Sequence, residues 1–293
     1  MTKSSDARNK IFNETKNTKQ SSVPDAPPGV ERRDIVRDEF GWDVPVESVP
    51  VPSRGRVYPP GSALHSRETL DIRAMTAREE DILTSQALIR KGTVIPTLLQ
   101  SVVLDPNVDV NDMLLGDRNA LMMATRVTGY GPKYTVDVKC PSCEARQEYD
   151  FDLGELPLKR LKIEPVHTGA NLFEFVLPVT KRTVHFKFLT GTEEENLSEA
   201  NNRRKALMPD MEVTSLVTSR LEAQVVSIDN IADKTKLSAF IRKMPAYDSR
   251  ILRGYISKNE PGIELKQVMK CRECTKSTNV EVPIGLSFFW PDL

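Results

Sequence analysis

Two short stretches, Cys140-Pro-Ser-Cys143 and Cys271-Arg-Glu-Cys274, contain every cysteine of the 293-residue chain. Two residues separate the cysteines of each pair, so a tight turn can direct both sulfur atoms at one ion. Two such turns supply the four ligands of a closed tetrahedral site, with metal–sulfur distances of about 2.3 Å. The pattern therefore predicts one structural Zn²⁺ per chain, bound by Cys140, Cys143, Cys271 and Cys274.

The residues that flank both cysteine pairs alternate as β-strands do. Tyr134, Val136 and Val138 alternate with polar residues before the first pair, and the same alternation follows the second pair over 280–284. Each pair is therefore expected to cap a β-hairpin, with the hairpins facing each other across the metal as in a zinc ribbon. Because residues 144–270 separate the halves, a subdomain whose ends return to the same place must be inserted between them.

The alternatives for this cluster are a pair of redox dithiols or four unrelated buried thiols. A disulfide framework is disfavoured because the sequence shows no secretory signal and cytosolic thiols stay reduced. A thioredoxin-like pair would open a helix after a strand, whereas β-type residues lie on both sides of each pair here. With all four positions filled by sulfur, no position remains for a bound water, so the ion is expected to be structural and not catalytic.

Composition narrows the class of protein. The chain has 41 basic and 41 acidic residues, so it is not built as a whole to neutralise phosphates. No apolar run approaches the roughly 18 residues that a membrane span needs. The sequence therefore predicts a soluble protein without a membrane segment, and it argues against nucleic acid as the partner.

We expect an α+β fold in which a small helical domain is joined to a split four-cysteine zinc ribbon of two β-hairpins, with an α/β subdomain inserted between the two halves. The expected segments are a disordered or partner-ordered arm (1–40), a Pro-rich extended segment (41–75), a helical domain (76–130), the first zinc hairpin (131–155), the inserted α/β subdomain (156–262), the second zinc hairpin (263–285) and an aromatic C-terminal tail (286–293).

The N-terminal segments are assigned from composition. Residues 1–40 have few apolar anchors and cannot bury enough surface to fold alone. Five prolines between Val44 and Pro60 force extended backbone around Pro52-Ser-Arg-Gly-Arg-Val-Tyr58. This strip either lies along a partner or packs on its own domain, and the sequence leaves both readings open.

Capping signals locate the helices of the helical domain. Thr76-Ala-Arg-Glu79 is a capping box, and Gly92 ends the helix that the box begins. Two further amphipathic helices are expected over residues 93–103 and from about 111 to 129.

The inserted region begins with a predicted hairpin whose strands are residues 172–177 and 183–189. Three helical segments follow, over 192–206, 214–226 and 233–258, the last interrupted by Pro245.

No catalytic constellation is evident. The three histidines are scattered and lack a spaced second ligand. The acidic runs Glu79–Asp81 and Glu193–Glu195 fall in first helical turns, where the helix dipole favours negative charge, although paired catalytic carboxylates are the alternative. The two cysteine hairpins together carry seven basic and seven acidic residues, whereas a nucleic-acid-binding ribbon would show a face of one sign.

The C-terminus carries three adjacent aromatic residues, Phe288, Phe289 and Trp290. Terminal segments fray unless they are tied down, and three exposed rings would form an apolar patch. We expect these rings to bind a groove in a partner protein. The alternative is a clasp onto the chain's own domain, against the helices of the insertion.

Several strings, in their order along the chain, resemble the baseplate hub-subunit family of T4-like contractile-tailed bacteriophages. They are the Pro-Ser-Arg-Gly-x-x-Tyr-Pro strip (52–59), Met-Thr-Ala-Arg-Glu-Glu-Asp-Ile-Leu (75–83), Gly-Asp-Arg-Asn-Ala (116–120), Arg-Val-Thr-Gly-Tyr-Gly (126–131), the first cysteine pair and the Phe-Phe-Trp-Pro ending (288–291). The resemblance covers about residues 45–155 and the end of the chain.

This resemblance implies a structural role without enzyme activity. The protein would be a component of the virion tail baseplate or of its assembly intermediate, assembled in the host bacterial cytoplasm, with other baseplate or hub proteins as partners. The alternative from another class is a zinc-ribbon adaptor that binds nucleic acid, and a hydrolase comes third.

Overall fold

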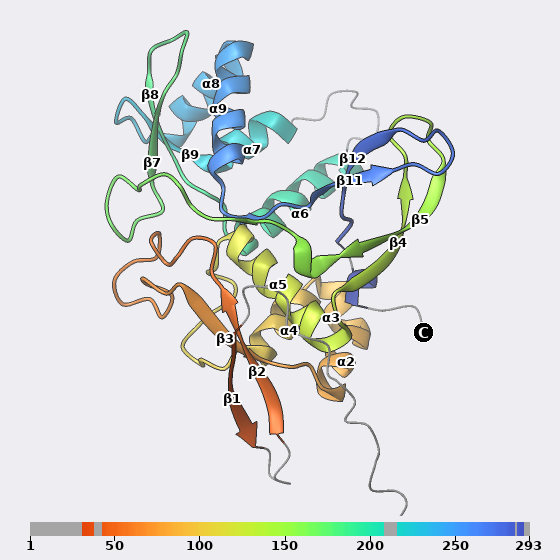
Figure 1. Ribbon diagram of the computed structural model, residues 1–293. Coiled ribbons are helices and arrows are strands. Elements are labelled where there is room, and N and C mark those ends of the chain that lie inside the picture. Colours follow the sequence, from red (N-terminus) through yellow and green to blue (C-terminus); the bar gives the residue numbers. More distant parts are fainter. Residues whose placement is uncertain (1–30, 38–42, 208–215, 285, 290–293) are drawn as a thin grey trace, which may run out of the picture.

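The computed structural model describes residues 31–37, 43–207, 216–284 and 286–289. These residues form small antiparallel sheets and helices around the central helix α5 (Figure 1). Within them, no helix combines the length and the apolar character that crossing a membrane requires.

The N-terminal part of the described chain is a three-stranded antiparallel sheet, in a region expected to be an arm (1–40) and a Pro-rich extended segment (41–75). Its strands, in the order β1-β2-β3, are Glu31–Arg37, Asp43–Pro50 and Thr69–Arg73. Residues 31–37, expected to be disordered or ordered by a partner, form β1 and pair with β2 of the same chain; residues 1–30 and 38–40 lie outside the described part. Pro50 is the last residue of β2, and Pro45 lies near its start, beside an irregularity in the pairing with β1, which are positions where a strand tolerates proline.

Four helices follow: α2 (Ala77–Thr84), α3 (Gln86–Lys91), α4 (Val94–Val102) and α5 (Leu115–Tyr130). The Glu79 carboxylate accepts hydrogen bonds from the backbone and the hydroxyl of Thr76 at 2.9 and 2.7 Å, as a capping box requires. Gly92 ends α3 with a left-handed φ of 70°. The single helix expected from Thr76 to Lys91 is divided at Ser85, which has extended backbone.

Helix α5 begins four residues later than the periodicity indicated. Before it, the side chains of Asp105 and Asp109 accept hydrogen bonds from the backbone N–H groups two residues on, at 3.0 and 2.8 Å. Such Asx turns compete with helix formation, so the chain enters α5 only at Leu115.

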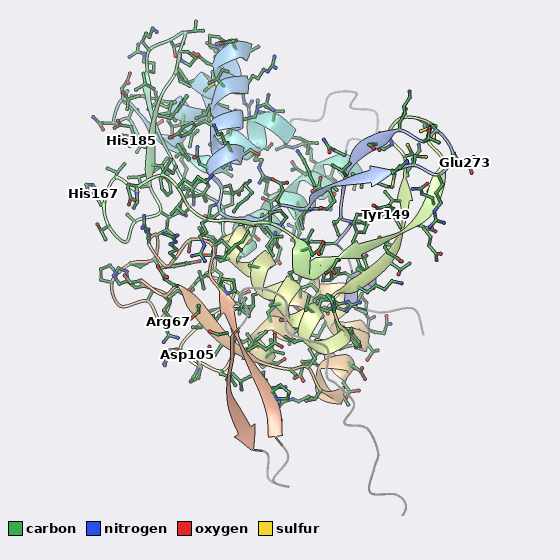
Figure 2. The ribbon with its side chains drawn as sticks, viewed as in Figure 1. Arg67, Asp105, Tyr149, His167, His185 and Glu273 are labelled. Atoms are coloured by element: carbon green, nitrogen blue, oxygen red, sulfur yellow. The ribbon has the colours of Figure 1, made fainter. Side chains whose placement is uncertain are left out.

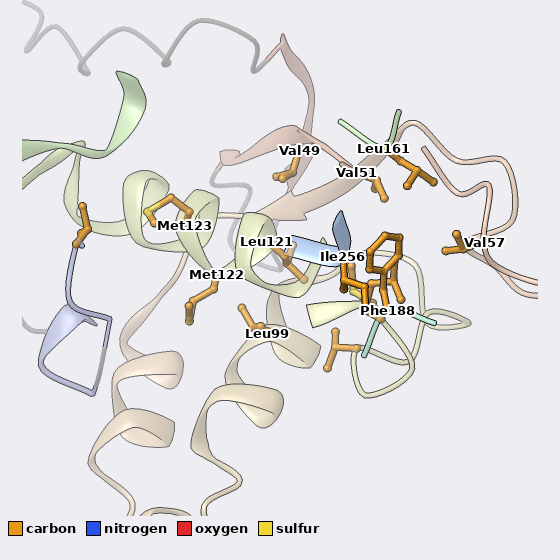
Figure 3. Close-up of a cluster of buried hydrophobic side chains, with 14 of the residues drawn as sticks. Val49, Val51, Val57, Leu99, Leu121, Met122, Met123, Leu161, Phe188 and Ile256 are labelled. Carbon is orange, nitrogen blue, oxygen red and sulfur yellow. The ribbon is translucent and has the colours of Figure 1, made fainter. Parts of the chain in front are cut away.

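The hydrophobic core lies around α5, which is buried on most sides. Figure 3 shows Leu121, Met122 and Met123 of α5 among side chains from the N-terminal sheet, from α4 and from the insertion. Because the N-terminal sheet, α4 and the insertion all pack against α5, this helix is the centre of the fold.

The insertion between the cysteine pairs has ends that meet. Strand β6 (Leu158–Lys159) pairs antiparallel with β10 (Gly262–Ile263). Between them, a three-stranded sheet of order β7-β8-β9 is accompanied by four helices. The strands are Phe173–Val176, Thr183–Phe186 and Val225–Ile228, and the helices are α6 (Gly191–Leu207), α7 (Leu216–Gln224), α8 (Lys234–Lys243) and α9 (Ala246–Asn259).

One helix of the insertion differs from its prediction. Residues 214–226 were expected to be helical, but α7 ends at Gln224 and Val225 starts strand β9. The β-branched residues Val225 and Val226 favour a strand, and pairing with β8 completes the sheet.

The two cysteine-bearing segments are hairpins, as expected. Strands β4 (Lys133–Lys139) and β5 (Arg146–Asp152) form the first hairpin, and β11 (Lys266–Lys270) and β12 (Ser277–Glu281) form the second. Short 3₁₀ helices, Leu153–Glu155 and Leu286–Phe289, follow them. The fold is therefore mixed α and β, with two small hairpins that end at the cysteines.

Candidate metal centre

The four cysteine side chains lie together where the tips of the two hairpins meet, close to Glu273 in Figure 2. Their sulfur atoms are all within 4.8 Å of one another, and all four cysteines are free. The Sγ atoms of Cys140 and Cys274 are 3.9 Å apart, and those of Cys143 and Cys271 are 3.7 Å apart. Because a tetrahedron with 2.3 Å metal–sulfur bonds has edges of about 3.8 Å, the cluster can hold one metal ion.

The two Cys-x-x-Cys turns share one local structure. The residue after the second cysteine has a left-handed φ in both, 63° for Glu144 and 57° for Thr275. The backbone N–H of the first cysteine donates to the carbonyl five residues further on, at 2.9 and 3.0 Å. Each hairpin is thereby closed over its own cysteines, and each presents two thiols to the other.

Gln147 connects the two hairpins and was missed from the sequence. Its buried amide accepts a hydrogen bond from the backbone N–H of Arg272 at 2.8 Å and donates to the carbonyl of Lys270 at 3.4 Å. Both partners flank Cys271, so Gln147 holds the second turn against the first hairpin. In the sequence, Gln147 is one polar residue in an alternating strand pattern, and nothing in that pattern indicates a contact with the other hairpin.

The crowded thiols do not ionise independently. The backbone N–H groups of Cys143 and Ser142 lower the pKa of the Cys140 thiol to about 6. The Ala145 N–H lowers the pKa of Cys143, but burial and hydrogen bonds with the other three thiols outweigh it and raise that pKa to about 12. Because metal ligands must be deprotonated, binding of a metal ion by these thiols would displace protons and would depend on pH.

The charges near the cluster are partly paired. A Zn²⁺–tetrathiolate centre would carry a charge of −2, and Lys139, Lys270 and Arg272 are the basic residues next to the cysteines in the sequence. Lys139 makes an ion pair with Glu144 at 3.2 Å, whereas Lys270 and Arg272 are exposed beside the second cysteine pair.

The structure corrects the assignment of the C-terminal aromatic residues. Phe288 and Phe289 are fully buried in the chain's own core, so these two rings offer no surface to a partner. Phe288 packs edge-on against Tyr134 at 5.1 Å and accepts a hydrogen bond at its carbonyl from the Arg126 Nε at 2.8 Å. The rings clasp α5 and the first hairpin, not the helices of the insertion, and Trp290 lies outside the described residues.

Arg126 is a buried cation bound by carbonyl groups. Besides the Phe288 carbonyl, its guanidinium donates to the carbonyls of Gly131 and Lys133 at 2.9 and 3.2 Å. Burial lowers its pKa. One side chain thus joins α5, the start of β4 and the C-terminal 3₁₀ helix.

A second junction lies at the start of α5, where three consecutive residues each fix a different segment. A Cβ on Gly116 would lie 1.7 Å from the Pro261 carbonyl oxygen, so only glycine allows the end of the insertion to approach. The Asp117 carboxylate accepts hydrogen bonds from the Ser53 N–H and hydroxyl at 2.8 and 2.5 Å and from the Tyr58 hydroxyl at 2.6 Å. Arg118 pairs with Glu195 of α6 at 2.8 Å.

The Asp117 contacts decide between the two readings of the Pro-rich strip. Burial raises the pKa of Asp117, although Ser53 and Tyr58 donate to it, and burial followed by Asp117 raises the pKa of Tyr58. Because Ser53 and Tyr58 are themselves buried, the strip over residues 52–58 packs on its own domain.

The acidic runs and the histidines form no further centre among the described residues. Glu79 is buried and paired with Arg73 at 2.7 Å, which goes beyond the helix-dipole explanation. In the second run, Glu194 and Glu195 pair with arginines at 2.8 Å. The histidines lie apart, and in the described chain only the four cysteines form a group of three or more potential metal ligands.

Comparison with known proteins gives one match. A family model described as "T4 bacteriophage base plate protein" matches residues 62–290, which includes the insertion and both cysteine pairs. Searches of curated proteins and of solved structures gave no match. The match covers more than half of the sequence, and the chain therefore belongs to the T4 bacteriophage base plate protein family.

Proposed function

We propose that this protein is a non-enzymatic structural or assembly component of the baseplate hub of a contractile phage tail, stabilised by one structural Zn²⁺. The observation that carries the proposal is the family match over residues 62–290. The partners are then other baseplate or hub proteins, the place of action is the virion tail, and assembly takes place in the host bacterial cytoplasm.

The donor set supports zinc as the metal. Four thiolates favour Zn²⁺ or an iron–sulfur centre over the hard cations Mg²⁺ and Ca²⁺. The Sγ separations of 3.7 and 3.9 Å suit a single tetrahedral ion. With four sulfur ligands no coordination position is left for water, so the ion would join the two hairpins and perform no chemistry.

The alternative is a zinc-ribbon adaptor that binds nucleic acid. The hairpins carry equal numbers of acidic and basic residues, seven of each, and basic residues such as Lys133 and Lys139 are paired with acids. A phosphate-binding face would instead present unpaired cations of one sign. This balance favours a protein partner for the hairpins.

The test is an inventory of particles. Mass spectrometry of purified tailed particles and of baseplate intermediates is expected to find the protein at a fixed ratio to other tail proteins. Deletion of its gene is expected to yield particles without functional tails. If the protein is absent from particles and intermediates, and tails assemble without it, the structural role is wrong.

A second measurement separates the two functions. Metal analysis of protein purified without chelator is expected to give one zinc per chain, and less than about half an equivalent would contradict the zinc site. The purified protein is expected to bind DNA weakly at low salt. Tight binding that weakens steeply with salt would favour the adaptor.

A further inference from the structure

A cavity of about 580 Å³ that includes none of the cysteines is lined mostly by basic residues. Its walls are the loop after β2, the segment that begins with β6, and the C-terminal end of α9. The charged lining residues are Arg54, Arg56, Lys159, Arg160, Lys162 and Lys258, and no carboxylate is among the lining residues. In a chain with equal numbers of acids and bases, this is a local excess of positive charge.

The cations of this cavity are largely without acidic partners in the described chain. Arg56 pairs at 2.5 Å with Glu164, which is mostly exposed. The buried Nε of Arg54 has no hydrogen-bond partner among the described residues. A buried donor without an acceptor costs free energy, and so does the mutual repulsion of neighbouring cations. A bound anion would remove both costs.

The cavity walls are fixed before any ligand binds. The Leu161 N–H donates to the Pro52 carbonyl at 3.0 Å, and the Lys159 ammonium donates to the Ser257 carbonyl at 3.1 Å. Ser53, next to Arg54, is held by Asp117. The backbone of the walls and the Lys159 side chain therefore need little rearrangement when a ligand arrives.

We propose that this cavity binds an acidic segment of a neighbouring tail protein through its aspartate and glutamate carboxylates. The choice of a protein segment rests on the proposed function. Arginine forks match carboxylates bidentately, and the volume is within the range of peptide and ligand sites. No aromatic residue lines the cavity, so it lacks the stacking platform that single-stranded nucleic acid uses.

The test uses the full-length zinc-loaded protein and fluorescein-labelled poly-L-glutamate, with binding followed by fluorescence anisotropy at low salt. A triple variant, Arg160→Gln, Lys162→Gln and Lys258→Gln, changes three exposed lining residues. It is expected to weaken binding about tenfold, as the loss of three partly screened ion pairs would. The matched control, Lys234→Gln, Lys236→Gln and Lys243→Gln, removes the same charge from α8 and is expected to bind as wild type does.

Arg54→Asn tests the buried donor, since asparagine tolerates the left-handed φ of 55° at this position. Equal weakening in both triple variants would overturn the site, and so would the absence of binding. Tighter binding of tripolyphosphate or oligothymidylate would replace the acidic segment by a phosphate ligand. These results are independent of the particle inventory, so this proposal and the structural role can fail separately.

Discussion

The two cysteine hairpins and the region around α5 both join segments that are far apart in sequence, but they do so by different means. Ten residues of α5 are buried, including the charged Asp117, Arg118 and Arg126. Strands β11 and β12 each bury a single side chain, Met269 and Val280. A two-stranded hairpin is marginally stable by itself, so we expect the hairpin pair, unlike the α5 region, to depend on a metal ion bound by the four cysteines.

In both regions, polar or charged side chains join segments in addition to buried apolar side chains. Around α5, the buried charged side chains Asp117, Arg118 and Arg126 contact backbone groups, hydroxyl groups or an oppositely charged side chain, and each joins α5 to another segment. At the hairpins, four thiols converge and one ion would satisfy them all. The predictions below test whether the two regions are stabilised separately.

The largest effect is expected from loss of the metal. Structural zinc sites in peptides bind with about 10–16 kcal/mol, much of which is folding free energy. Chelation, or Cys271→Ser, is expected to abolish zinc binding and the protection of the β4, β5, β11 and β12 amides against hydrogen exchange. The α5 amides are expected to stay protected, and Ser142→Ala is the control. If α5 loses protection together with the hairpins, the two regions form one cooperative unit.

Truncation of the buried ring at the C-terminus is expected to have the next largest effect. Phe288→Ala removes a fully buried ring that contacts Tyr134 and is expected to lower the free energy of unfolding by about 3–5 kcal/mol. Urea unfolding measures this. Zinc content is expected to remain at one equivalent, and Val268→Ala, on an exposed hairpin side chain, is expected to be neutral. Unchanged stability would restore the ring as a candidate partner contact.

The free energy of unfolding is expected to depend on pH through Glu79, a buried residue in the first turn of α2, by about 2–3 kcal/mol. Burial opposes its ionisation, but hydrogen bonds from Arg73 and Thr76 lower its pKa from 4.5 to about 2. Its contribution to stability is therefore complete above about pH 4.5 and is lost as the pH falls towards 2. Glu79→Gln is expected to lower stability at pH 7 and to flatten this acid dependence, whereas Asp81→Asn, on the exposed face, is not. An unchanged acid slope in Glu79→Gln would contradict the assignment.

Local signals in the sequence located much of this structure. The cysteine spacing and the flanking alternation predicted hairpins that bring four thiols together, and capping patterns at Thr76 and Asp233 placed helix starts within a residue. These signals depend on neighbouring residues, so they can be read without the fold. Strand β2 was missed because its prolines argue against a strand, whereas it pairs with both β1 and β3. Strand β1 was missed because its composition is polar and its partner lies in the next strand.

The buried charges could not be predicted from residue type, because charged side chains are usually exposed. Arg126 is buried since its acceptors are backbone carbonyls, one of them 162 residues away. One usable signal was present. Arg118, Met122 and Arg126 are spaced four residues apart, so the helical period places both arginines on the same face as an apolar methionine.

The smallest effect is expected at Gln147, and it tests how the hairpins are held apart from the metal. The residue accepts from the Arg272 N–H at 2.8 Å and donates to Lys270 at 3.4 Å, so its loss leaves one good hydrogen bond and one weak one unmade. Gln147→Ala is expected to cost about 1–2 kcal/mol. Because Arg272 follows Cys271 directly, the same change loosens the second turn, and zinc is expected to be released faster to a chelator. Glu148→Ala, on the opposite face of β5, is the control and is expected to change neither quantity.

Faster zinc release without a change in the hydrogen exchange of α5 would mean that Gln147 acts within the hairpin pair alone. A matching loss of protection in α5 would mean that the hairpins and the core are coupled through this amide, and the separation of the two regions would then be wrong.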